Sequence, residues 1–259
     1  MSNKIIDMRV VTLLSDFGSF YPAQMKAVIL GRVRGAGELA IVDIAHDIPP
    51  QDIRAGAFVL AATAKYFPKG TVHLAVVDPT VGTERLGIVV ESGGHFFVGP
   101  DNGLLIPAAK SLGTPDVYKI ALEFEAAPTF HGRDIFAPVA AMLASGQSIS
   151  SIGPAVDPVN LDFGSSRRVD SGIEATVVYI DSFGNVILNM RELPKSDLQL
   201  LGRRLLRLDT YAKAAGIEPL ITLGSHGFVE VAVNRGSAAD LFGLATGDTI
   251  ILEDMDCSE

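Results

Sequence analysis

The sequence predicts an α/β fold in two parts: an N-terminal domain with a mostly parallel, doubly wound sheet and helices on both faces, and a smaller C-terminal antiparallel β-barrel domain. In the first half, apolar β-branched runs alternate with helical stretches, which is typical of a parallel sheet. In the second half, short strands follow one another with turn residues between them. The rhythm changes across residues 153–172, which are rich in glycine, proline and serine, so the predicted domains are residues 1–165 and 166–259.

Each element of the first half has a local signal in the sequence. Apolar, β-branched runs predict strands at residues 9–15, 39–44, 72–77, 87–91 and 95–98. The last two strands are expected to form a hairpin around Gly93-Gly94. Pro22 in a first turn and Asp52 as an N-terminal cap mark the starts of the first two helices. Helices are expected at residues 22–33, 52–66, 104–112 and 135–144.

The second half contains shorter apolar runs with turns between them. Strands are expected at residues 173–180, 186–190, 205–208, 228–233 and 249–252. The turns at residues 183–185 and 224–227 are rich in glycine and small polar residues. Several short strands with little helix predict a small antiparallel barrel.

The composition of the chain narrows the function classes. The formal net charge of the 259 residues is −9, and an acidic protein repels phosphate backbones, so nucleic acid is not an expected partner. The longest apolar stretch, residues 55–64, is too short to span a bilayer, and no signal peptide is apparent, so no membrane partner is expected. Cys257 is the single cysteine, which excludes an intramolecular disulfide and a cysteine-based metal site and predicts a cytoplasmic protein.

Polar loops are expected to meet at one edge of the predicted parallel sheet. In doubly wound sheets, ligands bind beyond the carboxyl ends of the strands, where Asp16 and Asp78 follow the first and third strands. Arg85 lies in the same Gly/Pro-rich loop as Asp78, and His131 lies in a loop before a helix. Each alone fits a structural role better, such as an ion pair for Asp78 with Arg85. Taken alone, Asp16 is better explained as a helix or loop cap, and Asp134 as an N-terminal helix cap. Together, the loops predict a functional site that combines an aspartate, an arginine and a histidine.

Other segments carry polar side chains of less certain purpose. Phe183-Gly184-Asn185 is first of all a hairpin turn, but the Asn185 amide could bind the edge of a nucleobase while Phe183 stacks on it. The turn that holds Ser225 is likewise a turn first and a polar contact second. The five histidines lack the spacing of a zinc motif, and only the Asp43, His46 and Asp47 group remains a metal candidate.

Seven phrases, taken in their order and spacing, carry a resemblance to a known family over nearly the whole chain. They are Ser15-Asp16-Phe17-Gly18, residues 44–49 (IAHDIP), residues 77–85 (VDPTVGTER), Gly99-Pro100-Asp101-Asn102-Gly103, residues 130–136 (FHGRDIF), residues 180–185 (IDSFGN) and residues 233–238 (VNRGSA). On these phrases the chain resembles the S-adenosyl-L-methionine hydrolase (adenosine-forming) family, also called the SAM hydroxide adenosyltransferase family, which is related to the fluorinases and chlorinases.

The resemblance implies an α/β domain joined to a β-barrel, as the elements themselves predict. It also implies hydrolysis of S-adenosyl-L-methionine (SAM) to adenosine and L-methionine, with no cofactor or metal. The resemblance further implies a homotrimer, with the substrate held between the N-terminal domain of one subunit and the C-terminal domain of the next. The residues that match the family's catalytic triad are Asp78, Arg85 and His131. The substrate contacts that the resemblance implies are Asp16 with the ribose, Asp181 and Ser225 with the methionine end, and Phe183 and Asn185 with the adenine.

Two positions depart from the family pattern. Thr80 stands where the hydrolases usually have glycine, so it could narrow the water pocket or add a hydroxyl to it. His226 stands where relatives carry asparagine or arginine, which affects the expected contact with the methionine carboxylate.

The chemistry favours water as the nucleophile. A sulfonium leaves as neutral methionine, so the scarce element is an oriented, activated water, which the triad would hold in line with the ribose C5′. Phe17 or Phe183 could add a cation–π contact to the cationic substrate. A SAM-dependent 5′-halogenase is the near alternative, but a carboxylate such as Asp78 would repel a halide. Two more distant functions are a non-catalytic adenosine- or SAM-binding module and a metal-dependent phosphohydrolase built on Asp43, His46 and Asp47.

Overall fold

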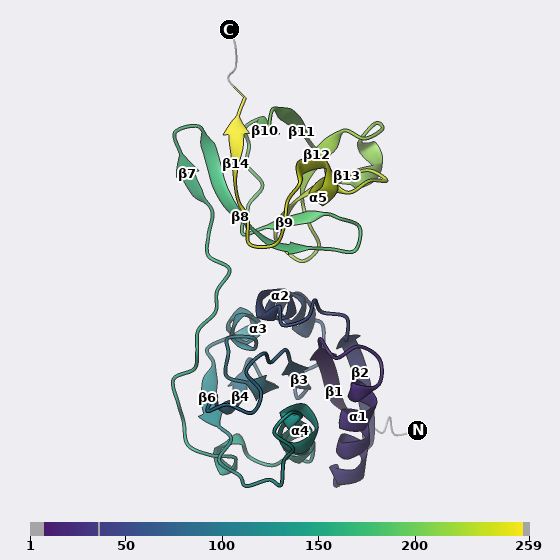
Figure 1. Cartoon of the computed structure of the whole chain (residues 1–259), viewed down its shortest axis with the longest axis vertical. Helices are drawn as coiled ribbons and strands as arrows, with labels where there is room; N and C mark the ends of the chain where they lie inside the picture. The colour runs from purple at the N-terminus through teal and green to yellow at the C-terminus, as the bar shows by residue number, and fades with distance from the viewer. Residues whose placement is uncertain (1–7, 36, 256–259) are drawn as a thin grey trace, which may run out of the picture. The chain divides into compact units, whose positions relative to one another are not determined.

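The computed structural model describes residues 8–35 and 37–255. The chain divides into two compact units, with the division between Asp162 and Phe163 (Figure 1). Ala36 and the single cysteine, Cys257, lie outside the described residues. Within the described residues, no helix is both long and apolar enough to cross a membrane.

The first unit is built on a six-stranded sheet whose strand order is β2-β1-β3-β5-β4-β6. β1 pairs in parallel with β2 and β3, and β3 pairs in parallel with β5, whereas β4 is antiparallel to both of its neighbours. The prediction of a mostly parallel sheet is therefore confirmed. The strands are β1 (Met8–Ser15), β2 (Glu38–Ala45), β3 (Val72–Val76), β4 (Gly87–Ser92), β5 (His95–Pro100) and β6 (Asp116–Lys119).

Helices cover both faces of this sheet, as predicted. α1 packs against α4, and α2 packs against α3; Figure 1 shows the two pairs on opposite faces. Asp52 caps α2 through a hydrogen bond from the Ala55 backbone nitrogen to its Oδ1 (2.9 Å). The helices are α1 (Tyr21–Arg32), α2 (Ile53–Ala64), α3 (Ile106–Leu112) and α4 (Ala137–Ala144), with a 3₁₀ turn, η2 (Ile149–Ser151).

The core between the sheet and the α1/α4 layer is built from apolar side chains. Leu13 from β1, Ile29 from α1 and Phe136 next to α4 are completely buried. Burying side chains of this size contributes about 1.5–3 kcal/mol each. This core fixes the carboxyl ends of β1 and β3 relative to the segment that leads into α4, and these places carry Asp16, Asp78 and His131.

The helix predicted from Ile135 begins earlier and differently. A π-helical turn, η1 (Gly132–Phe136), directly precedes α4, and His131 is the residue before it. The third helix begins at Ile106 rather than at residue 104. β6 was not predicted, because four residues at a sheet edge give little sequence signal before they pair with β4.

The second unit is a closed barrel. The strand order β14-β10-β11-β12-β13-β9-β8 returns to β14, which also pairs with β8, while β7 adds to the outer edge of β8. Closure leaves these seven strands without a free edge. All of the pairings are antiparallel except that of β11 with β12. The strands are β7 (Arg167–Val169), β8 (Gly172–Ile180), β9 (Val186–Leu188), β10 (Leu198–Leu200), β11 (Arg203–Arg207), β12 (Pro219–Leu223), β13 (Val229–Val233) and β14 (Thr249–Asp254).

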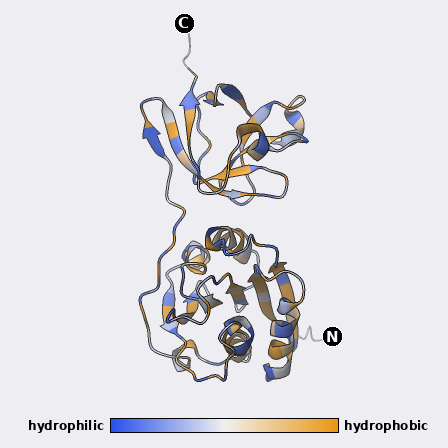
Figure 2. Ribbon diagram, viewed as in Figure 1, coloured by the Kyte–Doolittle hydropathy of each residue, from blue (hydrophilic) through white to orange (hydrophobic). Residues whose placement is uncertain are grey.

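The predicted antiparallel barrel is thus confirmed in outline, and it also contains β7, β10, β12 and one helix that the sequence did not predict. β10 is only three residues long, and β12 opens with Pro219, which weakens a strand signal although a first position tolerates it. The short helix α5 (Ala238–Phe242) and the 3₁₀ turn η3 (Tyr211–Lys213) lie in connections. Figure 2 shows hydrophobic colouring concentrated on strands such as β1 and β9, whose residues form the two cores.

Candidate active site

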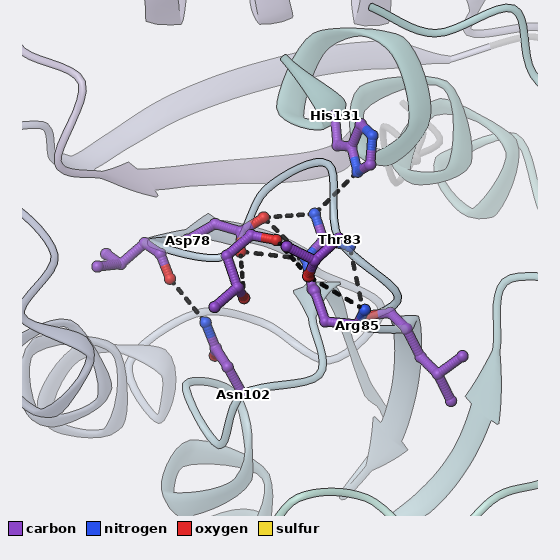
Figure 3. A network of polar contacts seen from close by, with 8 residues as sticks. Asp78, Thr83, Arg85, Asn102 and His131 are labelled. Carbon is purple, nitrogen blue, oxygen red and sulfur yellow. Dashed lines mark hydrogen bonds and ion pairs between the residues drawn. The ribbon is translucent and has the colours of Figure 1, made fainter. Parts of the chain in front are cut away.

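Asp78, Arg85 and His131 form one connected cluster in the first unit (Figure 3). Arg85 Nε lies 3.1 Å from Asp78 Oδ1 and 2.9 Å from Oδ2, and its Nη2 also donates to Oδ2. The same Nη2 lies 2.9 Å from His131 Nδ1. The Arg85 and Asp78 side chains are only 10 % and 3 % exposed. The arginine therefore links the loop after β3 to the segment that leads into α4.

The protonation of His131 follows from its partner. A guanidinium only donates hydrogen bonds, so Nδ1 must be the accepting nitrogen, and the neutral ring carries its proton on Nε2. Burial lowers the pKa of His131, the positive charge of Arg85 lowers it further, and the charges of Asp78 and Asp134 act in the opposite direction. The net effect keeps the ring neutral, with an Nε2–H group that can donate to an oxygen.

Asn102 anchors the loop that carries Asp78 through a hydrogen bond to the preceding residue, Val77. The Asn102 Nδ2 atom donates to the Val77 carbonyl oxygen (2.8 Å; Figure 3), and its Oδ1 accepts from the Leu104 backbone nitrogen (3.2 Å). Asn102 belongs to one of the seven family-like phrases but was not predicted as a site residue. Its signal in the sequence was its place after a strand in a Gly/Pro-rich turn.

Thr80 belongs to the same network. Its hydroxyl donates to Asp78 Oδ1 at 3.3 Å, and the Thr83 hydroxyl donates to its carbonyl oxygen at 2.8 Å. Thr80 therefore adds a hydroxyl directly on the Asp78 carboxylate. The guanidinium of Arg85 also lies over the ring of Phe136, with 5.2 Å between Cζ and the ring centroid, which favours the positive charge at this position.

The π-helical turn η1 places His131. Single π turns inside helices occur often at functional sites. Asp134 lies within this turn and does not cap a helix: it accepts a hydrogen bond from the Ala127 backbone nitrogen (3.0 Å) and pairs with Arg133, whose Nε is 2.6 Å from Oδ1. These bonds tie the segment before His131 to the turn that follows it.

Asp16 lies at the carboxyl end of β1, as predicted, and is oriented by a strained residue. Its Oδ2 accepts a hydrogen bond from the backbone nitrogen of Gln51 (2.8 Å). Gln51 has a φ angle of +67°, a conformation that non-glycine residues rarely adopt. The strained residue, Gln51, is therefore the one whose backbone nitrogen orients Asp16.

Phe17 lies apart from that bond, in an aromatic cluster. Its ring is edge-on to Phe130 (centroids 5.6 Å apart) and to Tyr21 (6.2 Å). The cluster borders a cavity of about 480 Å³, lined by Phe17, Tyr21, Gln24, Ala127, Thr129, Phe130 and Arg133.

The group considered as a metal candidate forms a hydrogen-bonded network instead. His46 bonds Ser15 through Nδ1 (2.8 Å) and Asp43 through Nε2 (3.0 Å), and Lys26 Nζ lies 2.5 Å from Asp43 Oδ2. Although partial burial acts in the opposite direction, the hydrogen bonds from Lys26 and His46 lower the pKa of Asp43. Across residues 8–35 and 37–255, no three His, Cys, Asp or Glu side chains gather to hold a metal ion.

In the barrel, Asp181 organises the turn that carries Phe183 and Asn185. Its Oδ1 accepts from the backbone nitrogens of Phe183 and Asn185, and its Oδ2 accepts from Asn185 Nδ2, each at 2.9 Å. Gly184 has a φ angle of +78°, and a Cβ atom there would lie 2.2 Å from Ser237 Oγ, so only glycine fits this turn. The Phe183 side chain is left 76 % exposed.

The same turn lines a cavity of about 590 Å³ in the barrel unit. Three of the four predicted barrel residues are brought together there, whereas Ser225 lies in the turn between β12 and β13 and is not part of the lining. Sequence reasoning missed Tyr211, which had no recognisable motif, and Arg235, which lies in one of the family-like phrases and has a φ angle of +59°. The lining residues are Asp181, Phe183, Asn185, Tyr211, Val233, Asn234, Arg235, Gly236 and Ser237.

Comparisons with known proteins agree over both units. Profiles described as the SAM hydroxide adenosyltransferase N-terminal domain and C-terminal domain match residues 11–153 and 175–251. The (R)-S-adenosyl-L-methionine hydrolase of Salinispora tropica is 43% identical over 226 residues, which cover 81% of this chain and 85% of that protein. The protein of the same name from Thermus thermophilus is 41% identical over 254 residues, covering 93% and 98%.

Among solved structures, an uncharacterized conserved protein from Thermotoga maritima superposes with a TM-score of 0.83 at 32% identity, covering 93% of this chain and 99% of that one.

Proposed function

Because the chain belongs to the SAM hydroxide adenosyltransferase family, we propose that it hydrolyses S-adenosyl-L-methionine to adenosine and L-methionine. The single observation that carries the proposal is the buried Asp78–Arg85–His131 cluster, in which one guanidinium holds a carboxylate and a neutral imidazole together. A neutral imidazole and a carboxylate beside a fixed positive charge are the groups that orient and deprotonate a water molecule.

The difficult part of the reaction is to activate the nucleophile, because water is a weak one. The C5′–S bond breaks as a water oxygen bonds to C5′ from the opposite side, and the sulfonium takes the bonding electron pair and leaves as the neutral thioether of methionine. The leaving group therefore needs no acid. The water proton goes to the Asp78 carboxylate, while His131 Nε2–H donates to the water oxygen and fixes its lone pair toward C5′. The charge of Arg85 favours the hydroxide character that develops.

Substrate contacts are proposed for the residues outside this cluster. Asp16, oriented by the Gln51 backbone nitrogen, accepts hydrogen bonds from the ribose hydroxyls. In the barrel, Phe183 and Asn185 hold the adenine, and Asp181 and Ser225 hold the methionine end. The support for the barrel contacts is that Asp181, Phe183 and Asn185 line one cavity. The aromatic ring of Phe17 is proposed to make a cation–π contact with the sulfonium of the substrate.

Assembly and location complete the proposal. On the family resemblance, we propose that the protein is a homotrimer. Each substrate would then lie between the N-terminal domain of one subunit and the C-terminal domain of the next. The cytoplasm remains the proposed location, because a chain with one cysteine suits a reducing compartment.

The decisive experiment follows the oxygen and the halide together. The purified protein is incubated with SAM and chloride in ¹⁸O-labelled water, and the nucleoside product is analysed by mass spectrometry. Adenosine with ¹⁸O at the 5′-hydroxyl, together with released methionine, is the expected result. A 5′-chloro nucleoside as the main product would favour the halogenase alternative, and adenosine without solvent oxygen would contradict water attack. Binding without methionine release would leave only a binding module.

A further inference from the structure

A buried carboxylate in the barrel joins two loops, one of which lines the cavity. Glu230, in β13, is only 2 % exposed. The Tyr211 hydroxyl donates to its Oε1, and His226 Nε2 lies 3.0 Å from its Oε2. Tyr211 comes from the connection between β11 and β12, and His226 comes from the turn between β12 and β13. One side chain therefore holds both connections to the barrel wall.

The geometry fixes the direction of the bond from His226. Its Nδ1 accepts a hydrogen bond from the Phe228 backbone nitrogen (3.2 Å), so the ring proton lies on Nε2 and is donated to Glu230. The fit is close: a Cβ atom on Gly224 would lie 2.5 Å from His226 Nε2 and 2.7 Å from Glu230 Oε2. The turn is thus packed directly onto the carboxylate, with Ser225 between the glycine and the histidine.

Tyr211 is held at the cavity by the same carboxylate. It lines the cavity together with Asp181, yet it stands on a single 3₁₀ turn in a long connection. A second tie, from Asn234 Nδ2 to the Ala214 carbonyl oxygen (3.1 Å), anchors the end of this turn. Burial and then the bond to Glu230 raise the pKa of Tyr211, so its hydroxyl remains a donor at neutral pH.

We propose that Glu230 is a positioning residue for substrate binding, which fixes the Tyr211 ring as a wall of the barrel cavity and the Ser225-His226 turn beside β13. The inference rests on the proposed function, because it assigns the barrel cavity to the substrate. Two donors from two loops require two accepting oxygens, and an apolar residue at this position would leave both donors without them. Since the triad lies in the first unit, loss of Glu230 should weaken binding and spare the chemical step.

Three variants test this, with KM, kcat and the Kd for adenosine measured by titration calorimetry. Glu230→Leu should raise KM and the adenosine Kd about tenfold or more, with kcat within about twofold, because both donors lose their acceptor. Glu230→Gln should keep KM and the adenosine Kd within about threefold of the wild-type values. The glutamine oxygen can accept from His226, and the glutamine NH₂ group can donate to the Tyr211 oxygen. Tyr211→Phe keeps the ring but not its anchor and should also raise both constants.

A matched control separates positioning from stability. Asn189 is a buried barrel side chain whose Oδ1 accepts from the Thr176 backbone nitrogen (2.9 Å), and it lies outside the cavity lining. Asn189→Ala should lower the melting temperature and leave KM and the adenosine Kd unchanged. Wild-type constants in Tyr211→Phe and Glu230→Leu, or equal losses in Asn189→Ala, would overturn the inference while SAM hydrolysis stands. A wild-type protein that binds adenosine without hydrolysing SAM would overturn the proposed function, and the adenosine Kd values would still decide the role of Glu230.

Discussion

Arg85 Nη2 lies 2.9 Å from Nδ1 of His131, and the two residues are 46 positions apart in the sequence. The contact sets the charge state of the imidazole, because a second proton on Nδ1 would point at a donor that carries a positive charge. The same guanidinium holds Asp78. Charge state and position in the cluster are therefore controlled by one residue.

Arg85→Gln should raise the pKa of His131. The wild-type pKa lies below the ordinary 6.5, first because of burial and then because of the Arg85 charge, while Asp78 acts in the opposite direction. Without the guanidinium, the unpaired Asp78 would favour the imidazolium. An NMR titration of the His131 ring, assigned with His131→Gln, measures both values. In the wild type, activity should persist below pH 6.5 and fall only as pH drops through the lowered pKa. An unchanged pKa in Arg85→Gln would contradict the assignment.

Asp78→Asn should lower kcat by about 100-fold or more, the range expected when a group that accepts a proton is removed. KM for SAM should change by no more than about threefold, because Asp16 and the barrel cavity are not altered. Steady-state kinetics with methionine release as the readout measure both. Asp197→Asn is the control: it breaks an exposed ion pair with Arg204 and should leave both constants unchanged. A wild-type kcat in Asp78→Asn would remove the carboxylate from the mechanism.

The sequence predicted that Asp78, Arg85 and His131 would meet, because strand ends are readable from apolar runs, and the structure brings the three side chains into contact. Asp78 directly follows β3, whose end is marked by an apolar run. His131 reaches the same place through the connection that leads from β6 into η1 and α4. The role of Asn102 was not readable, because its bond to the Val77 carbonyl joins residues 25 positions apart and depends on how two loops pack. Contacts of this kind appear only in the folded chain.

The barrel shows the same limit. Its strands β8, β9, β13 and β14 have clear apolar runs and were predicted, whereas β10 and β12 become strands by pairing with neighbours. Tyr211 lies in a connection without a pattern, and its partner Glu230 has the sequence signature of an ordinary polar residue in a strand. Propensity and periodicity carry no information about such a pair, since its geometry is set by closure of the barrel.

Asn102→Asp should be more damaging than Asn102→Ala. Alanine loses two hydrogen bonds, a destabilisation of about 1–3 kcal/mol. Aspartate can still accept from the Leu104 nitrogen, but it has no donor for the Val77 carbonyl and sets a negative oxygen 2.8 Å from it. The free energy of unfolding in urea and kcat should both fall in the order wild type, alanine, aspartate. Ser111→Ala, which removes a hydroxyl bonded to the Ala108 carbonyl within α3, is the matched control and should have a small effect.

His73 should make the first unit sensitive to acid. Burial lowers the pKa of His73 to about 3 from 6.5, and the charge of His95 acts in the same direction. The ring is held between the Thr12 hydroxyl (2.8 Å) and His95 (3.2 Å). Below pH 6.5 the unfolded chain binds a proton that the native state does not, so the free energy of unfolding should fall by up to about 1.4 kcal/mol per pH unit.

Comparison with His73→Gln isolates this contribution. Glutamine keeps a donor and an acceptor but does not titrate, so the variant should be less stable at pH 7 and lose less stability as the pH falls below about 6.5. Urea titrations of both proteins across this range measure the difference, in which the titrating groups that do not contact His73 cancel. Parallel pH dependences would show that His73 is not the responsible group.

Gly184→Ala should lower the stability of the barrel and weaken substrate binding in its cavity. Two effects contribute, the backbone conformation and a steric clash, and a control variant can separate them. Its φ angle of +78° disfavours any side chain, and the added Cβ would lie 2.2 Å from Ser237 Oγ and 2.9 Å from Ser237 Cα. Gly202 has a similar φ angle of +74° in the same barrel, but nothing lies within 4 Å of the Cβ position. Gly202→Ala should therefore lower the free energy of unfolding by about 1 kcal/mol, which is the cost of the backbone conformation alone. Gly184→Ala should lose about 1–3 kcal/mol more through the clash and should also raise KM, because the turn that carries Phe183 and Asn185 must move. Equal stabilities of the two variants in urea unfolding would show that the turn can shift freely and that its contact with Ser237 does not fix the cavity.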